Sequence, residues 1–299
     1  MATGLQDFIR YIINGLQLGS VYALVALGYT MVYGIVKLIN FAHGDFIMVG
    51  GYISVITIPF LSMWGMPGWL CVFAAVAMCA LIGVVTERVA YKPLRAAPRI
   101  SVLITAIGVS LLLQNLFMLI FTPNPRPFPA VFRNGGITVA GISVSYTDLV
   151  TILVSVLLMG ALQFFVKKTR IGKAMRAVSE DEGAAVLMGI PVNTTISVTF
   201  GIGAGLAAVA SVMYCAAYPL VEPTMGSMLG LKAFIAAVLG GIGSIPGAMA
   251  GGLLLGIAES MTKAYISSKL SDALVFGILI LVLLIRPAGI MGKNTGEKV

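Results

Sequence analysis

The stretch KLINFAHGDF, between Lys37 and Phe46, brings three polar side chains together: Asn40, His43 and Asp45. His43 is the only histidine of the chain, and the sequence on both sides is almost purely apolar. An imidazole beside a carboxylate could relay a proton, and the three side chains could also exchange hydrogen bonds with a small polar ligand. Because Gly44 lies among them, the stretch also indicates a break in a helix.

Two further polar pairs interrupt apolar runs. Gln114 and Asn115 lie in LLLQNLFML, and Glu259 and Lys263 lie four residues apart in GIAESMTKAY. The first pair is interpreted either as a hydrogen-bonding contact between helices or as part of a polar pathway. The second pair has the spacing of a local ion pair on one helix face.

The sequence contains no pattern typical of a catalytic or metal site. The loop GGIGSIPG is rich in glycine, but it lacks the spacing G-x-G-x-x-G, and no G-K-[ST] follows it. Cys71, Cys79 and Cys215 lie in apolar stretches without neighbouring ligands at metal-binding spacing, which indicates small core residues. The chain is therefore expected to be neither an enzyme nor the holder of a cofactor.

The elements that position these residues must be membrane helices. The chain of 299 residues is 59% hydrophobic and only 10% charged, with a mean hydropathy of +1.02. A soluble domain of this composition would have too little polar surface to cover it. The apolar runs reach about 20 residues, the length that an α-helix needs to cross hydrocarbon. The fold class is therefore an all-α polytopic membrane protein.

Basic residues cluster in short segments between the apolar runs and indicate orientation rather than nucleic-acid binding, despite the net charge of +8. The segments ERVAYKPLRAAPR and KKTRIGKAMR are the richest and are expected in the cytoplasm, as is the tail from Arg286. Residues 122–148 are rich in Pro and Gly with few charges. We expect them to form an external loop with a small β-like hairpin.

The order of the apolar runs predicts one transmembrane domain over residues 1–299. Inward crossings are expected for residues 68–87, 148–166 and 271–285, and outward crossings for residues 46–62, 100–121 and 192–217. Residues 231–268 must cross an even number of times, so they are expected to form a helical hairpin. Residues 8–45 form either one long span or two, the second short and broken. The bundle would have about eight to nine segments, including broken or short helices.

The loop of residues 167–191 is expected to contain a short amphipathic helix. Ser179 precedes Glu182 by three residues, as in a capping box, and Gly189 fits a helix C-cap. An apolar patch runs between them from Ala184 to Met188. Such a helix could enter a groove on a cytosolic partner or lie on the membrane surface, and the residues favour neither.

The order Glu182, Ala184, Ala185, Gly189 resembles the EAA loop of ABC importer permeases, with Gly183 inserted between the acid and the alanines. Three longer blocks carry a more specific resemblance: NGLQLGSVYALVALGYTMVYGIVKLINFAHGDF, TERVAYKPLR and KAFIAAVLGGIGSIPGAMAGGLLLGIAES. Together they resemble the LivH-type permease subunit of the branched-chain (hydrophobic) amino-acid ABC transporter family. The resemblance begins at about residue 14 and is weakest in residues 122–148.

This resemblance implies a permease of the bacterial cell inner membrane that imports branched-chain or related hydrophobic amino acids. It also implies three kinds of partner: a LivM-like second permease subunit, two cytosolic ATPase subunits that bind ATP and magnesium, and a periplasmic substrate-binding protein. Residues 167–191 would then carry the coupling helix. The implied ATPase-coupling residues are Arg176, Glu180, Asp181, Glu182, Ala184, Ala185 and Gly189.

In such a permease, the candidate residues of the substrate pathway are Asn40, His43, Asp45, Gln114 and Asn115. A broken helix can offer free backbone and side-chain groups to a zwitterionic amino acid. Alternatively, His43 and Asp45 hold the break in shape without contacting substrate.

Other functions are compatible with the same residues. The resemblance also admits a urea or short-amide substrate. A stand-alone proton-coupled amino-acid transporter would use His43 and Asp45 as a proton relay. A passive channel would allow downhill flux that substitutions in residues 180–189 leave unaffected.

Overall fold

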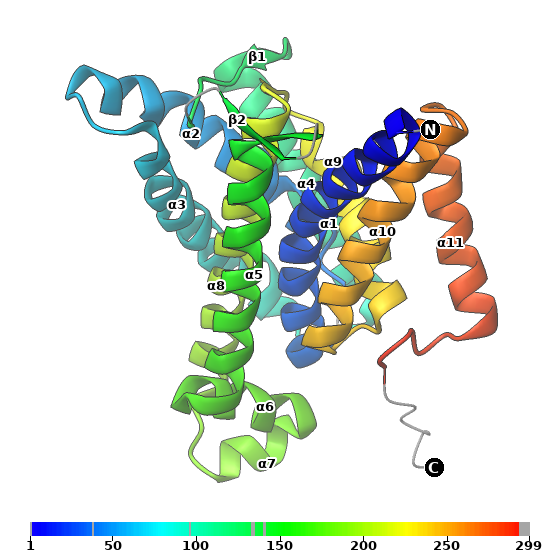
Figure 1. The fold of residues 1–299 in the computed structure, drawn as a ribbon. Coiled ribbons are helices and arrows are strands. Elements are labelled where there is room, and N and C mark those ends of the chain that lie inside the picture. Colours follow the sequence, from blue (N-terminus) through cyan, green and yellow to red (C-terminus); the bar gives the residue numbers. More distant parts are fainter. Residues whose placement is uncertain (1, 38, 96, 133–134, 140–141, 293–299) are drawn as a thin grey trace.

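The computed structural model describes residues 2–37, 39–95, 97–132, 135–139 and 142–292, which form a helical bundle (Figure 1). The α-helices are α1 (Ala2–Val36), α2 (Asp45–Met63), α3 (Cys71–Thr86), α4 (Arg99–Phe121), α5 (Tyr146–Lys168), α6 (Arg170–Glu180), α7 (Glu182–Leu187), α8 (Val192–Ala217), α9 (Met225–Gly240), α10 (Ile245–Tyr265) and α11 (Ser271–Ile285). The tail predicted from Arg286 is described only to Gly292, and its remainder lies outside the described residues.

Within the described residues, six helical segments are long and apolar enough to cross a membrane. They are Gly4–Val36, Phe41–Met63, Gly68–Leu94, Ile100–Phe121, Tyr146–Lys168 and Val192–Ala217. Met225–Gly240 and Ser271–Ile285 are shorter apolar helices. These segments agree with the predicted class of polytopic helical membrane protein, and the predicted limits 192–217 and 271–285 coincide with α8 and α11.

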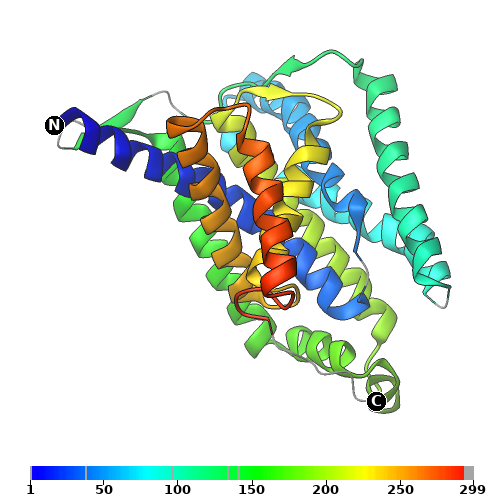
Figure 2. The same ribbon diagram turned by 90° about the vertical axis from the view of Figure 1, so that its right-hand side faces the viewer.

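Helices α1 and α8 form the centre of the bundle. The most apolar 18-residue window of α1 is 78% buried, and that of α8 is 89% buried. Helix α1 packs along α10, α8, α5 and α9, and α8 also packs on α3 and α2. By contrast, only 17% of the α4 window is buried, and α4 lies at the edge of the bundle (Figure 2).

The two ends of the bundle differ in structure. The N-terminus and the short strands lie at one end, whereas α6 and α7 lie at the other (Figure 1). Strand β2 (Gly136–Val139) pairs antiparallel with β3 (Ile142–Ser145), so the hairpin predicted within residues 122–148 is confirmed. Strand β1 (Arg126–Pro127) pairs antiparallel with β4 (Leu220–Val221), which ties the loop before α5 to the loop before α9.

The first part of the chain forms one long helix followed by a break, which decides between the two arrangements expected for residues 8–45. Helix α1 runs to Val36, and α2 begins at Asp45 after the single 3₁₀ turn η1 (Phe41–His43). The ring of His43 lies against Gly28, eight residues before the end of α1, which is about 12 Å along the helix axis. The chain therefore turns back into the bundle before α2 starts.

The residues of the predicted hairpin, 231–268, form the two helices α9 and α10, and the first helix starts earlier than predicted. Helix α9 begins at Met225, and the turn between Gly240 and Ile245 contains Gly241 and Gly243 with positive φ angles of 104° and 92°. The turn packs against the segment after α11, because the amides of Ile290 and Met291 donate to the carbonyls of Leu239 and Gly240.

Candidate functional site

The three polar residues of KLINFAHGDF lie together inside the bundle. Asn40 is 2% exposed, and His43 and Asp45 are each 1% exposed. The Tyr91 hydroxyl donates to Asn40 Oδ1 at 2.6 Å. Tyr91 ends a short π-helical turn, η3 (Glu87–Tyr91), that extends α3. The break is therefore held from the side by a neighbouring helix end.

The imidazole of His43 lies between α1 and α8. Its ring centroid lies 4.6 Å from that of Tyr29 in an edge-to-face arrangement. A Cβ atom at Gly28 would overlap His43 Nε2, and a Cβ at Gly203 would lie 3.4 Å from Cε1. The ring thus occupies space that exists because residue 28 has no side chain.

Asp45 and Gln114 are brought into contact although they are distant in sequence. Gln114 Nε2 donates to Asp45 Oδ1 at 2.9 Å and lies 3.1 Å from Ser110 Oγ and 3.0 Å from Ser227 Oγ. Asn115 does not join this group, since it donates to the Leu111 carbonyl of its own helix at 2.8 Å. Adjacent residues on an α-helix point about 100° apart, so only one of the two amides faces the break.

Two helices begin at the same place beside the break. Gly44 precedes α2, and Gly226 lies in the first turn of α9. The backbones of Gly44 and Gly226 touch, because a Cβ at either glycine would overlap the other's carbonyl oxygen. The positive ends of the α2 and α9 helix dipoles therefore both lie beside the break, inside the bundle.

Three polar atoms of the break have no hydrogen-bond partner among the described residues. They are Asn40 Nδ2, His43 Nε2 and Asp45 Oδ2. Leaving a buried polar atom unpaired typically costs about 1–3 kcal/mol. A site that transiently binds a polar molecule needs such free groups.

Glu87 forms a buried ion pair that the sequence analysis missed. It is 0% exposed, pairs with Arg95 and accepts a 2.5 Å hydrogen bond from Ser197 Oγ. Arg95 also donates to Asn193 Oδ1 at 2.6 Å. These contacts attach the segment after α3 to the first turns of α8. The sequence feature that could have indicated this ion pair is a glutamate at the end of an apolar run, in TERVAYKPLR.

Glu259 lies at the centre of a second buried network. The predicted pair with Lys263 is confirmed at 2.6 Å, but Glu259 also binds Lys232 at 2.8 Å and accepts from the Tyr22 hydroxyl at 2.8 Å. Lys232 in turn binds Asp272 at 2.7 Å. Sequence reasoning missed Lys232, whose signal was a single lysine within the apolar arm LKAFIAAVL.

The segment of residues 167–191 folds as two short helices, and the predicted cap of the second is wrong. Ser179 lies inside α6 and donates to the Arg176 carbonyl, whereas Asp181 caps α7 by accepting from the Ala184 amide at 2.9 Å. The structure favours Asp181 because its extended backbone, with φ of −153°, directs the side chain at the free amides. Ser179 is helical and cannot do so.

The C-terminal end of α7 follows the prediction at Gly189. Gly189 has a φ of +76°, its amide donates to the Val186 carbonyl, and the Ile190 amide donates to the Ala185 carbonyl. This is a Schellman arrangement, which glycine adopts without steric strain. Just before it, Leu187 is 89% exposed and Met188 is 82% exposed. Helix α7 thus presents an apolar tip at the end of the molecule (Figure 1).

The predicted coupling residues are mostly exposed around this tip, whereas Ala185 is buried. Ala185 belongs to a second hydrophobic core, separate from the main one. The buried members of this second core are Val32, Tyr91, Val102, Ala106, Val178, Ala185, Val192, Ile196 and Phe200. The second core therefore joins α6 and α7 to α1, α4, α8 and the Tyr91 side chain.

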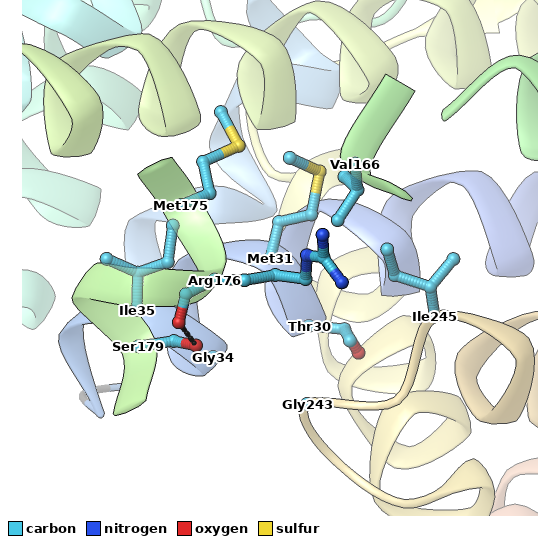
Figure 3. A pocket seen from close by; sticks show the side chains of 10 residues that line it. All are labelled: Thr30, Met31, Gly34, Ile35, Val166, Met175, Arg176, Ser179, Gly243 and Ile245. Atoms are coloured by element: carbon cyan, nitrogen blue, oxygen red, sulfur yellow. Dashed lines mark hydrogen bonds between the residues drawn. The ribbon is translucent and has the colours of Figure 1, made fainter. Parts of the chain in front are cut away.

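A small cavity lies between α6 and the neighbouring helix ends (Figure 3). Its volume is about 80 Å³, and its wall includes Thr30, Met31, Met175, Arg176 and Gly243. The Arg176 side chain crosses it, and its guanidinium lies 3.4 Å from the Lys167 carbonyl. The cavity marks loose packing where α6 meets α1 and the turn between α9 and α10.

Comparisons with known proteins agree with this architecture. Residues 11–283 match the family described as "Branched-chain amino acid transport system / permease component". The chain is 46% identical to the high-affinity branched-chain amino acid transport system permease protein BraD of Pseudomonas aeruginosa, over 98% of both chains. It is also 46% identical to the corresponding permease protein LivH of Escherichia coli, again over 98% of both chains. The chain therefore belongs to the family of branched-chain amino acid transport system permease components.

Proposed function

We propose that the chain is the permease subunit of an ATP-driven importer for branched-chain or related hydrophobic amino acids. The observation that carries this proposal is the 46% identity, over 98% of both chains, to permease proteins named for that transport system. Helical segments long enough to span a membrane fit the same role. Substrate would cross within the bundle, and the chain itself would catalyse no covalent step.

The proposal includes three kinds of partner. A LivM-like second permease would complete the pathway, two cytosolic ATPase subunits would bind ATP and magnesium, and a periplasmic protein would deliver substrate. The thinly covered helix α4, at the edge of the bundle, is consistent with a further membrane subunit. The protein would then lie in the bacterial inner membrane, with nine crossings if α9, α10 and α11 also span it.

The orientation follows from charge. The end that carries α6 and α7 also carries Lys167, Lys168, Arg170 and Lys173, and the Arg95–Asn193 contact places the other basic segment beside it. Basic residues in short loops favour the cytoplasmic side. We therefore place α7 in the cytoplasm and the N-terminus and strands outside.

Coupling to the ATPases would occur through α7. Its apolar tip, formed by Val186, Leu187 and Met188, could enter a groove on an ATPase, with Glu180, Asp181 and Glu182 around it. Movement of α7 would reach the break through the second core, because that core contains both Ala185 and Tyr91, and Tyr91 binds Asn40.

The substrate pathway would pass the break. Support comes from the unpaired atoms of Asn40, His43 and Asp45 and from the two helix N-termini that meet there. Gln114 adds a polar wall from α4. Asn115 points elsewhere and forms no part of this proposal.

The proposed function can be tested with the complete complex reconstituted in liposomes. ATP-dependent uptake of leucine is expected only when the second permease, the ATPases and the binding protein are all present. Uptake by this chain alone under a pH gradient would support a proton-coupled transporter. Downhill leucine flux without ATP would support a channel, and uptake of urea in place of leucine would change the substrate class.

A further inference from the structure

Asp45 differs from the other deeply buried carboxylates of the described chain in lacking a cation. Asp45, Glu87 and Glu259 are each no more than 1% exposed. Glu87 pairs with Arg95, and Glu259 pairs with Lys232 and Lys263. No ion pair of Asp45 occurs among the described residues, where its partners are neutral: the Gln114 amide and the Ser110 hydroxyl. A carboxylate inside a membrane bundle normally requires a positive partner.

Burial opposes the charged form of the Asp45 carboxylate, and nearby helix ends offset that cost only in part. Asp45 is the first residue of α2, so the positive end of that helix stabilises its negative charge. The start of α9 lies beside it through the contact of Gly44 with Gly226. These helix ends lower the cost of a negative charge at Asp45, but Oδ2 is buried and still accepts no hydrogen bond within the described structure.

The approach to Asp45 is polar and partly open. Gln114 is half-buried, and Ser227 beside it is exposed. The Gln114 amide has two hydrogens but three acceptors within reach: Asp45, Ser110 and Ser227. It can therefore leave Asp45 and retain hydrogen bonds to the two serines. Such an exchange would free Asp45 Oδ1 on the side that faces Ser227.

We propose that Asp45 binds the ammonium group of the transported amino acid, with Gln114 as the group that the ammonium displaces. An ammonium has three donors and one positive charge, which supplies the hydrogen bond that Oδ2 lacks and the cation that the fold does not provide. This inference rests on the proposed function, because it assigns the ammonium group of the transported amino acid to the carboxylate of Asp45.

The charge of Asp45 can be tested without transport. Ser227→Cys in the complete complex places a thiol beside the site, and the native Cys71, Cys79 and Cys215 are each 0% exposed. We expect a cationic methanethiosulfonate reagent to react faster than an anionic one. The ratio of the two rates should fall at least about tenfold when Asp45→Asn is added, and leucine should slow the cationic reagent. An unchanged ratio would overturn the proposal, as would protection by sodium ions but not by leucine.

Transport provides the second measurement. Asp45→Asn keeps the size of the side chain and the acceptor for Gln114, so the fold should persist. We expect leucine uptake to fall at least about tenfold, with the complex still assembled on size exclusion. Asp148→Asn is the matched control, since Asp148 also lies in the first turn of a helix, and it should change uptake less than about twofold.

The experiments distinguish a failure of the ammonium site at Asp45 from a failure of the proposed permease function. If the complex with Asp45 imports leucine normally and Asp45→Asn does too, the ammonium site is wrong but the permease function stands. If the unaltered complex imports no leucine while Asp45→Asn still lowers the rate ratio in the Ser227→Cys variant, the proposed substrate is wrong and the assignment of a leucine ammonium falls with it.

Discussion

At the scale of single residues, the break depends on how closely its side chains fit. His43 fills the space beside Gly28, and its unpaired Nε2 lies against α1. A side chain held so tightly responds when its neighbour gains even a methyl group. A substitution in α1 at Gly28 should therefore disturb the break, although Asn40, His43 and Asp45 themselves are unchanged.

Gly28→Ala is expected to displace the His43 ring and lower leucine uptake at least about tenfold, because overpacking typically costs about 1–3 kcal/mol. Gly34→Ala on the same helix is the control, since its Cβ would meet nothing closer than 4.0 Å. It should leave uptake unchanged. The double variant Gly28→Ala with His43→Ala should assemble better than Gly28→Ala alone, because the smaller side chain makes room. Equal uptake by the Gly28→Ala and Gly34→Ala variants in proteoliposomes would contradict this.

At the scale of helices, the π-helical turn η3 connects the break with the α7 end. Glu87 and Arg95 attach it to α8, and Tyr91 reaches Asn40 from the second core. Such turns cost regular hydrogen bonds and often lie at functional sites. If α7 moves on contact with an ATPase, as we propose, this turn would carry the movement to the start of α2.

Tyr91→Phe removes only the hydroxyl, so the aromatic contact with Phe200 should persist. The lost hydrogen bond, about 0.5–1.5 kcal/mol, should loosen the break and lower the amount of leucine moved per ATP hydrolysed. Tyr146→Phe, at the first residue of α5 directly after strand β3, should have no effect. Asn40→Ala should act similarly, and the double variant should be no worse than the stronger single one. Additive losses would show that the two residues act separately.

The end of α7 makes a second prediction at this scale. Gly189→Val places a β-branched residue at a φ of +76°, which costs about 1–2 kcal/mol, and should distort the tip. We expect ATP hydrolysis without matching uptake, with membrane insertion intact. Gly183→Ala, within α7 at an ordinary φ and with its nearest contact at 3.4 Å, should behave as the unaltered chain. Normal coupling in Gly189→Val would count against α7 as the contact with the ATPases.

At the scale of the whole molecule, the fold packs two long helices, α1 and α8, at its centre and leaves others thinly covered. The break lies inside the bundle, where α2 begins beside α1 and α9. Polar chemistry is thereby placed inside the membrane, while the basic segments and α7 gather at one end. This separation suits a permease in which ATPase subunits contact the end with α7 and substrate passes the break inside the bundle.

The orientation makes a prediction for the intact membrane. Gly183→Cys in α7 should react with a membrane-impermeant thiol reagent only from the cytoplasm, and Met63→Cys at the end of α2 only from outside. The native cysteines are buried and should contribute little background. Labelling of both variants from the same side would refute the assignment of three crossings, by α3, α4 and α5, between these two positions.

The sequence alone determined the class of protein, most helix limits, the α9–α10 hairpin and the family resemblance. These follow from composition, from the length of apolar runs and from local motifs, which do not depend on the neighbours of a segment. Tertiary structure decided which polar residues meet: Gln114 but not Asn115 with Asp45, Tyr91 with Asn40, and Lys232 with Glu259. It also replaced Ser179 with Asp181 as the cap of α7. Each of these contacts depends on helix rotation or backbone direction, which is set only when all the helices pack together.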